Sequence, residues 1–296
     1  MQKRIWSQYN KDLVQRGSIT FFIEEKTFQK IQNFRGKSTG GRPQEFPLML
    51  IQLLLFVKIQ YSLTYRSLEG FAKSTLQKMY GWLEVPSYSL ICKRAKELSH
   101  SLPKLSSRRP TVVLIDASGI KVFGEGEWKR KIHGVGRPRK WLKIHIAVDE
   151  TSQEIVAECL TDSSVADATM VDTLLESKTS VRVVKADGAY DRKCARDAAK
   201  KRKACLLAPP PKNARVNGTN QERDNAVLSI RGLGGDLCAR SLWGRFTGYS
   251  YRALVETAFS RYKRLFGCRL FSKTLERQLV ENRLKWVMLN KMRKVA

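Results

Sequence analysis

Apolar positions in the first third of the chain recur with a helical period. Residues 47–59 are apolar enough for a buried helix, and residues 62–72 continue the helical pattern with polar residues at the ends. A third helix is expected from about Ser87 to Leu98. Residues 1–105 therefore predict a small all-α domain.

The order of these helices resembles a helix-turn-helix. In that case the helix from Ser87 is the recognition helix, and Lys93 and Arg94 are candidates for contacts with DNA bases and phosphates. The alternative is a plain helical bundle with no nucleic-acid surface. The pattern alone leaves both interpretations open.

The pattern changes after a linker at about residues 101–110, where short β-branched runs alternate with turns. The expected strands are residues 111–116, 119–123, 142–148, 155–161, 181–186 and 204–207. The early strands follow one another through turns and predict an antiparallel meander. Helices over residues 166–175 and 191–203 separate the later strands. The second domain is therefore predicted as α/β, with one mixed sheet.

Residues at about 208–247 interrupt this domain. The segment opens with three consecutive prolines, is rich in Arg, Gly and Asn, and predicts a basic insertion of poorly defined structure. A helix from Tyr249 follows it, and another is expected over residues 274–292. We therefore assign residues 106–296, with the insertion, to the α/β domain.

Two of the predicted strands end in an aspartate. Asp116 follows the run 111–115, and Asp187 follows the run 181–186. A carboxylate at the end of a buried strand is costly without a partner, so each is expected to meet a cation or hydrogen-bond donors. The two strands are expected to be neighbours in the sheet.

A third acidic residue lies in the helix after the insertion, where Tyr249, Arg252, Glu256 and Lys263 stand at offsets of 0, 3, 7 and 14. At about 100° per residue, their side chains project within about 60° of one another. An adjacent stripe is apolar and can pack into a core. The alternative is an amphipathic surface helix with an ordinary Arg–Glu pair four residues apart.

The chain carries 55 Lys and Arg against 27 Asp and Glu, a net charge of +28. This excess favours a polyanionic partner, and nucleic acid fits better than a membrane because no isolated basic amphipathic anchor stands out. A generally basic protein without such a partner is the alternative. The six cysteines and three histidines lack the spacing of a zinc site or a disulfide framework.

The first residues lack the apolar core of a signal peptide, and the longest apolar run, residues 48–57, is too short to span a bilayer. We therefore expect a cytoplasmic protein with no membrane partner.

Three acidic side chains, Asp116, Asp187 and Glu256, that converge without His or Cys suit a hard cation such as Mg²⁺ or Mn²⁺. Two such ions about 4 Å apart are a known device for in-line phosphoryl transfer. In a chain of this charge, the expected phosphate is that of a nucleic-acid backbone.

In these residues the chain resembles the DDE transposases of bacterial insertion sequences, in the branch with a Y-(2)-R-(3)-E-(6)-K signature. Tyr249, Arg252, Glu256 and Lys263 match that spacing without a gap. L-I-D-A-S-G-I-K-V and K-A-D-G-A-Y-D resemble the first and second aspartate motifs of the family, and W-S-Q-Y-N-K-D-L-V-Q-R-G-S resembles its N-terminal region. The similarity covers nearly the whole chain.

The resemblance implies a ribonuclease H-like catalytic core, an N-terminal DNA-binding domain, and metal-dependent strand cleavage and transfer at terminal inverted repeats. It implies Asp116, Asp187 and Glu256 as catalytic ligands of two Mg²⁺ or Mn²⁺ ions. The residues that it assigns to DNA phosphates near the cleaved end are Tyr249, Arg252 and Lys263. The expected partners are double-stranded DNA, at the element ends and the target, and a second copy of the chain in the DNA complex. Nucleoid association is expected while DNA is bound.

Two other functions are compatible with the same residues. A catalytically inactive DNA-binding protein, either a transposition repressor or a decayed copy, would keep the basic charge, but the intact acidic set weighs against decay. A cellular nuclease of the same fold is also possible, because metal-ion chemistry alone does not distinguish hydrolysis from strand transfer.

Overall fold

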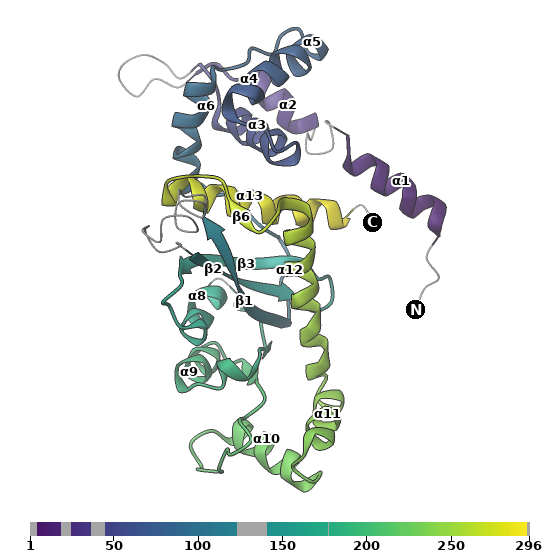
Figure 1. The fold of residues 1–296 in the computed structure, drawn as a ribbon, viewed down its shortest axis with the longest axis vertical. Coiled ribbons are helices and arrows are strands. Elements are labelled where there is room, and N and C mark those ends of the chain that lie inside the picture. Colours follow the sequence, from purple (N-terminus) through teal and green to yellow (C-terminus); the bar gives the residue numbers. More distant parts are fainter. Residues whose placement is uncertain (1–4, 19–24, 37–44, 123–140, 177, 295–296) are drawn as a thin grey trace, which may run out of the picture. The chain divides into compact units, whose positions relative to one another are not determined.

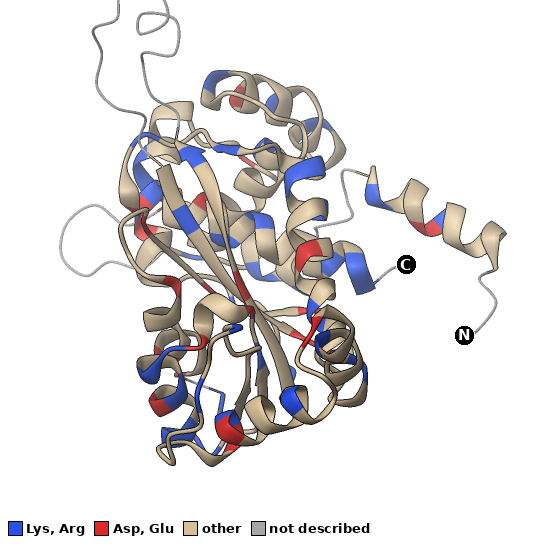
Figure 2. Ribbon diagram, turned by 60° about the horizontal axis from the view of Figure 1, so that its bottom comes forward, with Lys and Arg blue, Asp and Glu red and all other residues tan. Residues whose placement is uncertain are grey.

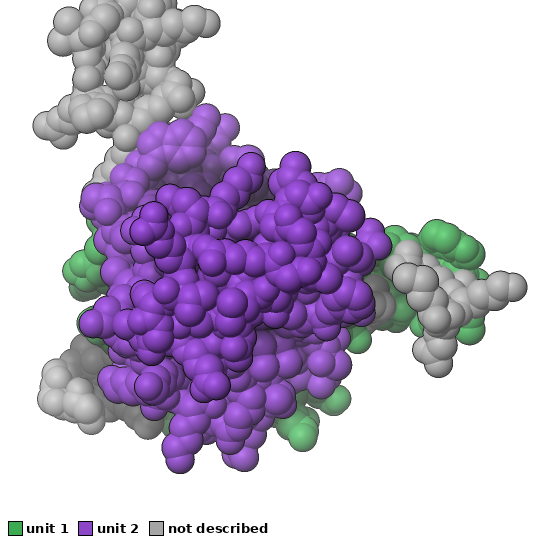
Figure 3. Space-filling view, turned by 90° about the horizontal axis from the view of Figure 1, so that it is seen from below, with its two compact units in different colours: residues 1–104, 270–296 green, residues 105–269 purple. Residues whose placement is uncertain are grey.

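The chain folds into two compact units (Figures 1 and 3). The computed structural model describes residues 5–18, 25–36, 45–122, 141–176 and 178–294. Unit 1 comprises residues 1–104 and 270–296, and unit 2 comprises residues 105–269. The predicted domains, 1–105 and 106–296, are divisions by function and stay a prediction. Residues 270–296 are grouped with the N-terminal helices in the compact unit.

Unit 1 is helical. Its described elements are α1 (Trp6–Arg16), α2 (Glu25–Gln32), α3 (Leu48–Gln60), α4 (Tyr65–Ser74), α5 (Leu76–Met79), α6 (Tyr88–Ala95), the 3₁₀ helix η1 (Glu97–His100) and α13 (Leu275–Lys294). The three helices predicted from the apolar pattern are confirmed as α3, α4 and α6, with η1 continuing the last of them. Helix α13 packs against α3 and η1.

Two of these helices begin at residues whose side chains cap them. Thr64 Oγ1 accepts the N–H of Ser67 at the start of α4, and Ser87 Oγ accepts the N–H of Leu90 at the start of α6. Such caps satisfy backbone donors that a helix leaves without an internal partner, and each contributes about 1 kcal/mol. The polar residues in the sequence therefore mark the helix starts correctly.

No single helix in the described part of the chain is long and apolar enough to cross a membrane. Helices α3 and α4–α5 meet that test only when taken together, across a bend of 104°. Most of the apolar side chains of α3 are buried in unit 1.

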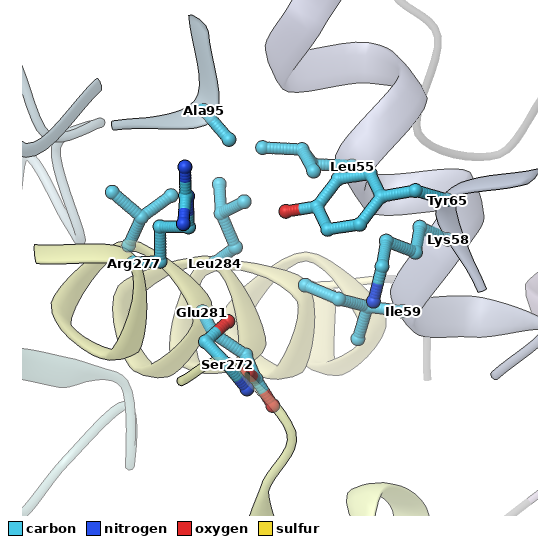
Figure 4. Close-up of a pocket in the computed structure, with 10 residues that line it drawn as sticks. Leu55, Lys58, Ile59, Tyr65, Ala95, Ser272, Arg277, Glu281 and Leu284 are labelled. Atoms are coloured by element: carbon cyan, nitrogen blue, oxygen red, sulfur yellow. Dashed lines mark hydrogen bonds between the residues drawn. The ribbon is translucent and has the colours of Figure 1, made fainter. Parts of the chain in front are cut away.

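A pocket in unit 1 lies among α3, α4, α6 and α13 (Figure 4). Lys58 and Tyr65 line it from α3 and α4, and Arg277 and Glu281 line it from α13. Burial lowers the pKa of Lys58 and raises the pKa of Tyr65 to about 12. Polar groups of α13 are therefore part of the interior of this unit.

A buried ion pair lies next to this pocket. Lys285 Nζ is 2.8 Å from Glu281 Oε1, and their side chains are 2% and 8% exposed. Glu281 also accepts the N–H groups of Phe271 and Ser272, at 3.0 and 2.9 Å. The pair therefore fixes the segment that leads into α13.

Unit 2 contains a mixed sheet, as the strand pattern predicts. Its described strands are β1 (Val112–Val122), β2 (Trp141–Asp149), β3 (Ile155–Asp162), β4 (Val183–Lys185) and β5 (Cys205–Leu207), and β6 (Arg269–Leu270) begins at the last residue of the unit. The order is β3-β2-β1-β4-β5, and β6 pairs with β1 off this path. β1, β2 and β3 form an antiparallel meander, while β4 and β5 run parallel to β1.

Strand β1 corrects one prediction. The sequence suggested two strands, 111–116 and 119–123, but residues 112–122 form one strand, and Phe123 lies outside the described residues. The residues between the two predicted strands stay in register with β2, where Ala117 pairs with His145 and Gly119 with Lys143. The ladder to β2 satisfies their backbone groups, so the small residues do not end the strand.

Helices cover both faces of this sheet (Figure 1). The helical elements in the described part of unit 2 are η2 (Asp167–Met170), α8 (Val171–Leu175), η3 (Gly188–Tyr190), α9 (Lys193–Lys201), α10 (Gln221–Gly232), α11 (Leu237–Phe246), η4 (Tyr249–Arg252) and α12 (Ala253–Phe266). Val113 and Ile115 point into a core shared with α8 and α9. Because side chains alternate along a strand, Asp116 and Ser118 point to the opposite face, where α12 contacts β1.

The insertion is better ordered than the sequence suggested. Residues 208–247 contain α10 and α11, which begin at the side-chain caps Asn220 and Asp236. Trp243 of α11 is 4% exposed and belongs to a small apolar cluster with residues of α10. The Gly and Arg content masked this helical pattern, whereas the two caps were a readable signal.

Candidate active site

The two aspartates are brought together by parallel pairing. β1 and β4 are neighbours, as predicted, and Leu114 pairs with Lys185. Asp116 and Asp187 each follow two residues later, so both lie just beyond the paired segment. Asp116 is in the middle of the long strand β1, not at a strand end as the sequence suggested. Asp187 follows β4 by two residues and caps η3, where its Oδ1 accepts the N–H of Ala189 at 2.9 Å.

The third acidic residue comes from the segment after the insertion. Glu256 is in the first turn of α12. Tyr249 and Arg252 precede it in the 3₁₀ helix η4, so the predicted single α-helix from Tyr249 is wrong for its first turn. Gly248 has a left-handed backbone, with φ of 67°, and separates α11 from η4. This glycine breaks the helical run and sets the direction of η4.

Arg252 connects the three carboxylates. Its Nη2 lies 3.1 Å from Oδ2 of Asp116 and 3.9 Å from Oδ2 of Asp187. Its Nη1 donates to Oε1 of Glu256 over 2.6 Å. The structure therefore gathers all three predicted acidic residues around a single guanidinium group within unit 2.

The site opens to solvent on one side. The exposed fraction of the side chain rises from 15% for Asp116 to 37% for Asp187 and 60% for Glu256. A ligand can therefore approach past Glu256 and Asp187, while Asp116 forms the floor.

The pKa values of Asp116 and Arg252 reflect their burial and the closeness of the other charged groups. Burial raises the pKa of Asp116, and the charges of Asp187 and Glu256 raise it further, against the N–H of Ala117 and the Arg252 charge. Burial alone lowers the pKa of Arg252, but the surrounding acidic groups outweigh it, and the pKa of Arg252 is raised. The site thus has an excess of negative charge that favours cations.

The donor set fits a divalent cation. Asp116, Asp187 and Glu256 supply carboxylate oxygens, which Mg²⁺ and Mn²⁺ prefer. The three carboxylates surround the guanidinium of Arg252 in this structure. They do not lie at metal-binding distances from one another, and the described residues contain no other group of three His, Cys, Asp or Glu side chains that does. Cation binding therefore requires Arg252 to give up at least part of these contacts.

The other two residues of the predicted stripe lie next to this cluster. Lys263 Nζ donates to Ser118 Oγ over 2.7 Å, on the same face of β1 as Asp116. The ring of Tyr249 is 5.5 Å from that of Trp243 and is half-buried, and burial raises its pKa. Lys263 is therefore on the side of the carboxylates, whereas Tyr249 packs on the insertion.

Comparison with known families settles what kind of protein carries this site. Two family models, both described as Transposase DDE domain, match residues 14–125 and 107–290. The second match covers more than half of the chain. The chain belongs to the DDE transposase family. Membership makes it a DNA-cleaving and strand-transferring enzyme and implies that it uses a divalent metal ion.

The transposase carries its other two candidate DNA contacts in unit 1, on α6. Lys93 is exposed. Arg94 is only 6% exposed, and its guanidinium donates to Glu97 and to the carbonyl oxygen of Phe46. We expected both side chains to be available to DNA, but the structure places only Lys93 at the surface. The helical period was a readable signal, because Arg94 stands three residues after Ile91 and four before Leu98, on the apolar side of the helix.

Sequence reasoning also missed residues of the transposase that support the site. Lys185 Nζ is hydrogen-bonded to the carbonyl oxygen of Gly248 and ion-paired with Glu150. A lysine two residues before the second aspartate was a readable signal, because it shares a strand face with Asp187.

Proposed function

We propose that this transposase binds the terminal inverted repeats of an insertion sequence and cleaves and joins DNA strands at Asp116, Asp187 and Glu256. The observation that carries the proposal is the convergence of these three carboxylates on Arg252, on one face of a mixed sheet. The geometry supports the branch with the Y-(2)-R-(3)-E-(6)-K signature, whose four positions lie in η4 and α12.

Each acidic residue has a separate position in this mechanism. Asp116, on the central strand, gives the site a fixed floor, while Asp187 and Glu256 reach it from η3 and α12. When bound, a pair of Mg²⁺ or Mn²⁺ ions supplies Lewis-acid stabilisation of the attacking and leaving oxygens. The three carboxylates would hold and orient these ions, and the attacking oxygen would come from a water or a DNA 3′-hydroxyl.

Arg252 and Lys263 are the proposed phosphate contacts near the cleaved end. Without DNA, the guanidinium of Arg252 balances the charge of the acidic cluster. A phosphate offers it the same bidentate pairing that a carboxylate does, so DNA binding can draw Arg252 away from the acidic cluster. Lys263 is anchored near β1 by Ser118 and supplies a second positive charge, and Tyr249 is a third contact at the edge of the insertion.

Unit 1 is the proposed DNA-recognition unit, with α6 as the recognition helix. Lys and Arg are spread over both units (Figure 2), and the net charge of +28 supports a backbone-following contact with double-stranded DNA. We further propose a homodimer in the DNA complex, with nucleoid association while DNA is bound.

The test uses the purified full chain and a duplex that carries the DNA flanking its gene. We expect cleavage at the element ends in Mg²⁺ or Mn²⁺, none after chelation, and binding that weakens steeply with salt. A random duplex of equal length is the control. Equal cleavage of both duplexes would indicate a nuclease, and end binding without cleavage would indicate an inactive DNA-binding protein.

Substitutions in α6 separate DNA contact from folding. Lys93→Ala should weaken end binding with little effect on stability, because Lys93 is exposed. Arg94→Ala should instead lower the melting temperature, because it leaves Glu97 and the carbonyl of Phe46 without their partner. Binding isotherms and thermal melts of both variants check this. A Lys93→Ala protein that binds as tightly as the unchanged chain would argue against α6 as the recognition helix.

A further inference from the structure

Lys185 is a charged residue held almost completely inside unit 2. It ends β4, two residues before Asp187, and its side chain is 7% exposed. Nζ lies 2.7 Å from the carbonyl oxygen of Gly248 and 2.7 Å from Oε2 of Glu150. It also lies 5.4 Å from the centre of the Tyr251 ring. A buried ammonium group is costly unless it is paired, and these contacts supply the pairing.

These contacts connect three separate parts of the unit. Glu150 follows β2, Lys185 ends the strand that leads to Asp187, and Gly248 and Tyr251 belong to the start of η4. A single ammonium group therefore fixes the turn before Arg252 against the strand that leads to Asp187.

Gly248 shows how closely the two segments approach. Its φ of 67° is unfavourable for residues with a side chain, and a Cβ atom built there would lie 3.2 Å from Lys185 Nζ. The glycine thus permits both the turn and the contact. Arg252 follows only four residues later, so a shift of this turn displaces the guanidinium from the carboxylates.

We propose that Lys185 is a positioning residue for strand cleavage, which holds η4 so that Arg252 stands beside the acidic cluster, within reach of a phosphate at the cleaved end. The effect of Lys185 on cleavage rests on the proposed function, whereas its effect on the position of η4 does not. It does not touch the reacting groups; it acts through Gly248 and Tyr251 on the placement of Arg252. A misplacement of about 1 Å in an active site can lower a rate about 100-fold.

The experiment compares Lys185→Met, which keeps an unbranched side chain one atom shorter and removes the charge, with Lys185→Arg, which keeps the charge. Amide hydrogen exchange of residues 248–253 in the full chain without DNA reports the hold on η4. Lys185→Met should speed this exchange at least tenfold, and Lys185→Arg should restore part of the protection. Single-turnover cleavage of element ends should fall about 100-fold in Lys185→Met, whereas end binding should weaken far less, because unit 1 is the proposed recognition unit.

Arg202→Met is the matched control. Arg202 also pairs with a carboxylate and a carbonyl in unit 2, those of Asp172 and Leu175, on α8. It should leave both the exchange at residues 248–253 and the cleavage rate unchanged.

A double substitution distinguishes an effect on the position of Arg252 from a general loss of protein stability. If Lys185 acts through Arg252, Lys185→Met should lower the cleavage rate much less in an Arg252→Ala background than in the otherwise unchanged chain. Additive losses, or unchanged exchange at residues 248–253 in Lys185→Met, would overturn the proposal. If the unchanged chain cuts no element end, the proposed function fails, but the exchange measurement still decides whether Lys185 holds η4.

Discussion

Glu256→Gln should lower metal-dependent cleavage of element ends by about a hundredfold or more while end binding persists. The change keeps the shape of the side chain and removes the charge that a divalent cation requires. Asp116→Asn and Asp187→Asn should have the same effect. Cleavage of a labelled duplex, measured at several Mg²⁺ and Mn²⁺ concentrations beside a binding isotherm, checks both parts.

Asp197→Asn is the control for this series. Asp197 is an exposed aspartate of α9 in the same unit, so the substitution changes the net charge equally and should leave cleavage intact. Combining two of the three active-site changes should cost little more than one, because the ligands act as a unit. A Glu256→Gln enzyme that cuts at a near-normal rate would rule out the proposed acidic set.

Lys285→Met should destabilise the protein by about 3–5 kcal/mol, because it leaves Glu281 charged and buried without its partner. Chemical denaturation, followed by circular dichroism of the full chain, measures the loss. Lys96→Met is the matched control in the same unit. Lys96 pairs with Glu276 at the surface, where solvent screens the charges, so its loss should leave the stability nearly unchanged.

The pH dependence of this loss of stability follows from the ionisation of Glu281. Burial alone raises its pKa, but Lys285 and the N–H and hydroxyl donors around it outweigh burial and lower the pKa below its ordinary value. A lowered pKa in the folded state stabilises the fold above the ordinary pKa of the group, and this contribution disappears as pH falls through the folded-state pKa. The deficit of Lys285→Met should therefore shrink in acid. An equal deficit at all pH values would argue against an ionised Glu281.

Much of the fold was predictable because it follows from local patterns. Apolar period and polar caps located α3, α4 and α6, and β-branched runs located the sheet. The break predicted within residues 111–123 was wrong, because hydrogen bonding to β2 outweighs the weak strand preference of Ala117, Ser118 and Gly119. That long-range pairing leaves no signal in the local sequence.

The candidate site was predictable in its residues but not in its geometry. The spacing of Arg252 and Glu256 identified them as neighbours. It did not show that η4 is a 3₁₀ helix, which starts after the left-handed Gly248, whose carbonyl oxygen accepts a hydrogen bond from Lys185 of a distant strand. Arg94 was predicted at the surface, but it lies on the packed side of α6 and donates a hydrogen bond to the carbonyl oxygen of Phe46. In both cases, tertiary contacts decide the position of a charged side chain.

Unit 1 is assembled from two stretches of sequence separated by the whole of unit 2. During synthesis on the ribosome, residues 105–269 emerge complete while the N-terminal helices still lack α13 and its buried Glu281–Lys285 pair. Domains generally fold as units as they emerge, so the catalytic sheet can fold before unit 1 is complete. A premature stop codon anywhere before α13 therefore leaves unit 1 incomplete, however much of the acidic site has already been made.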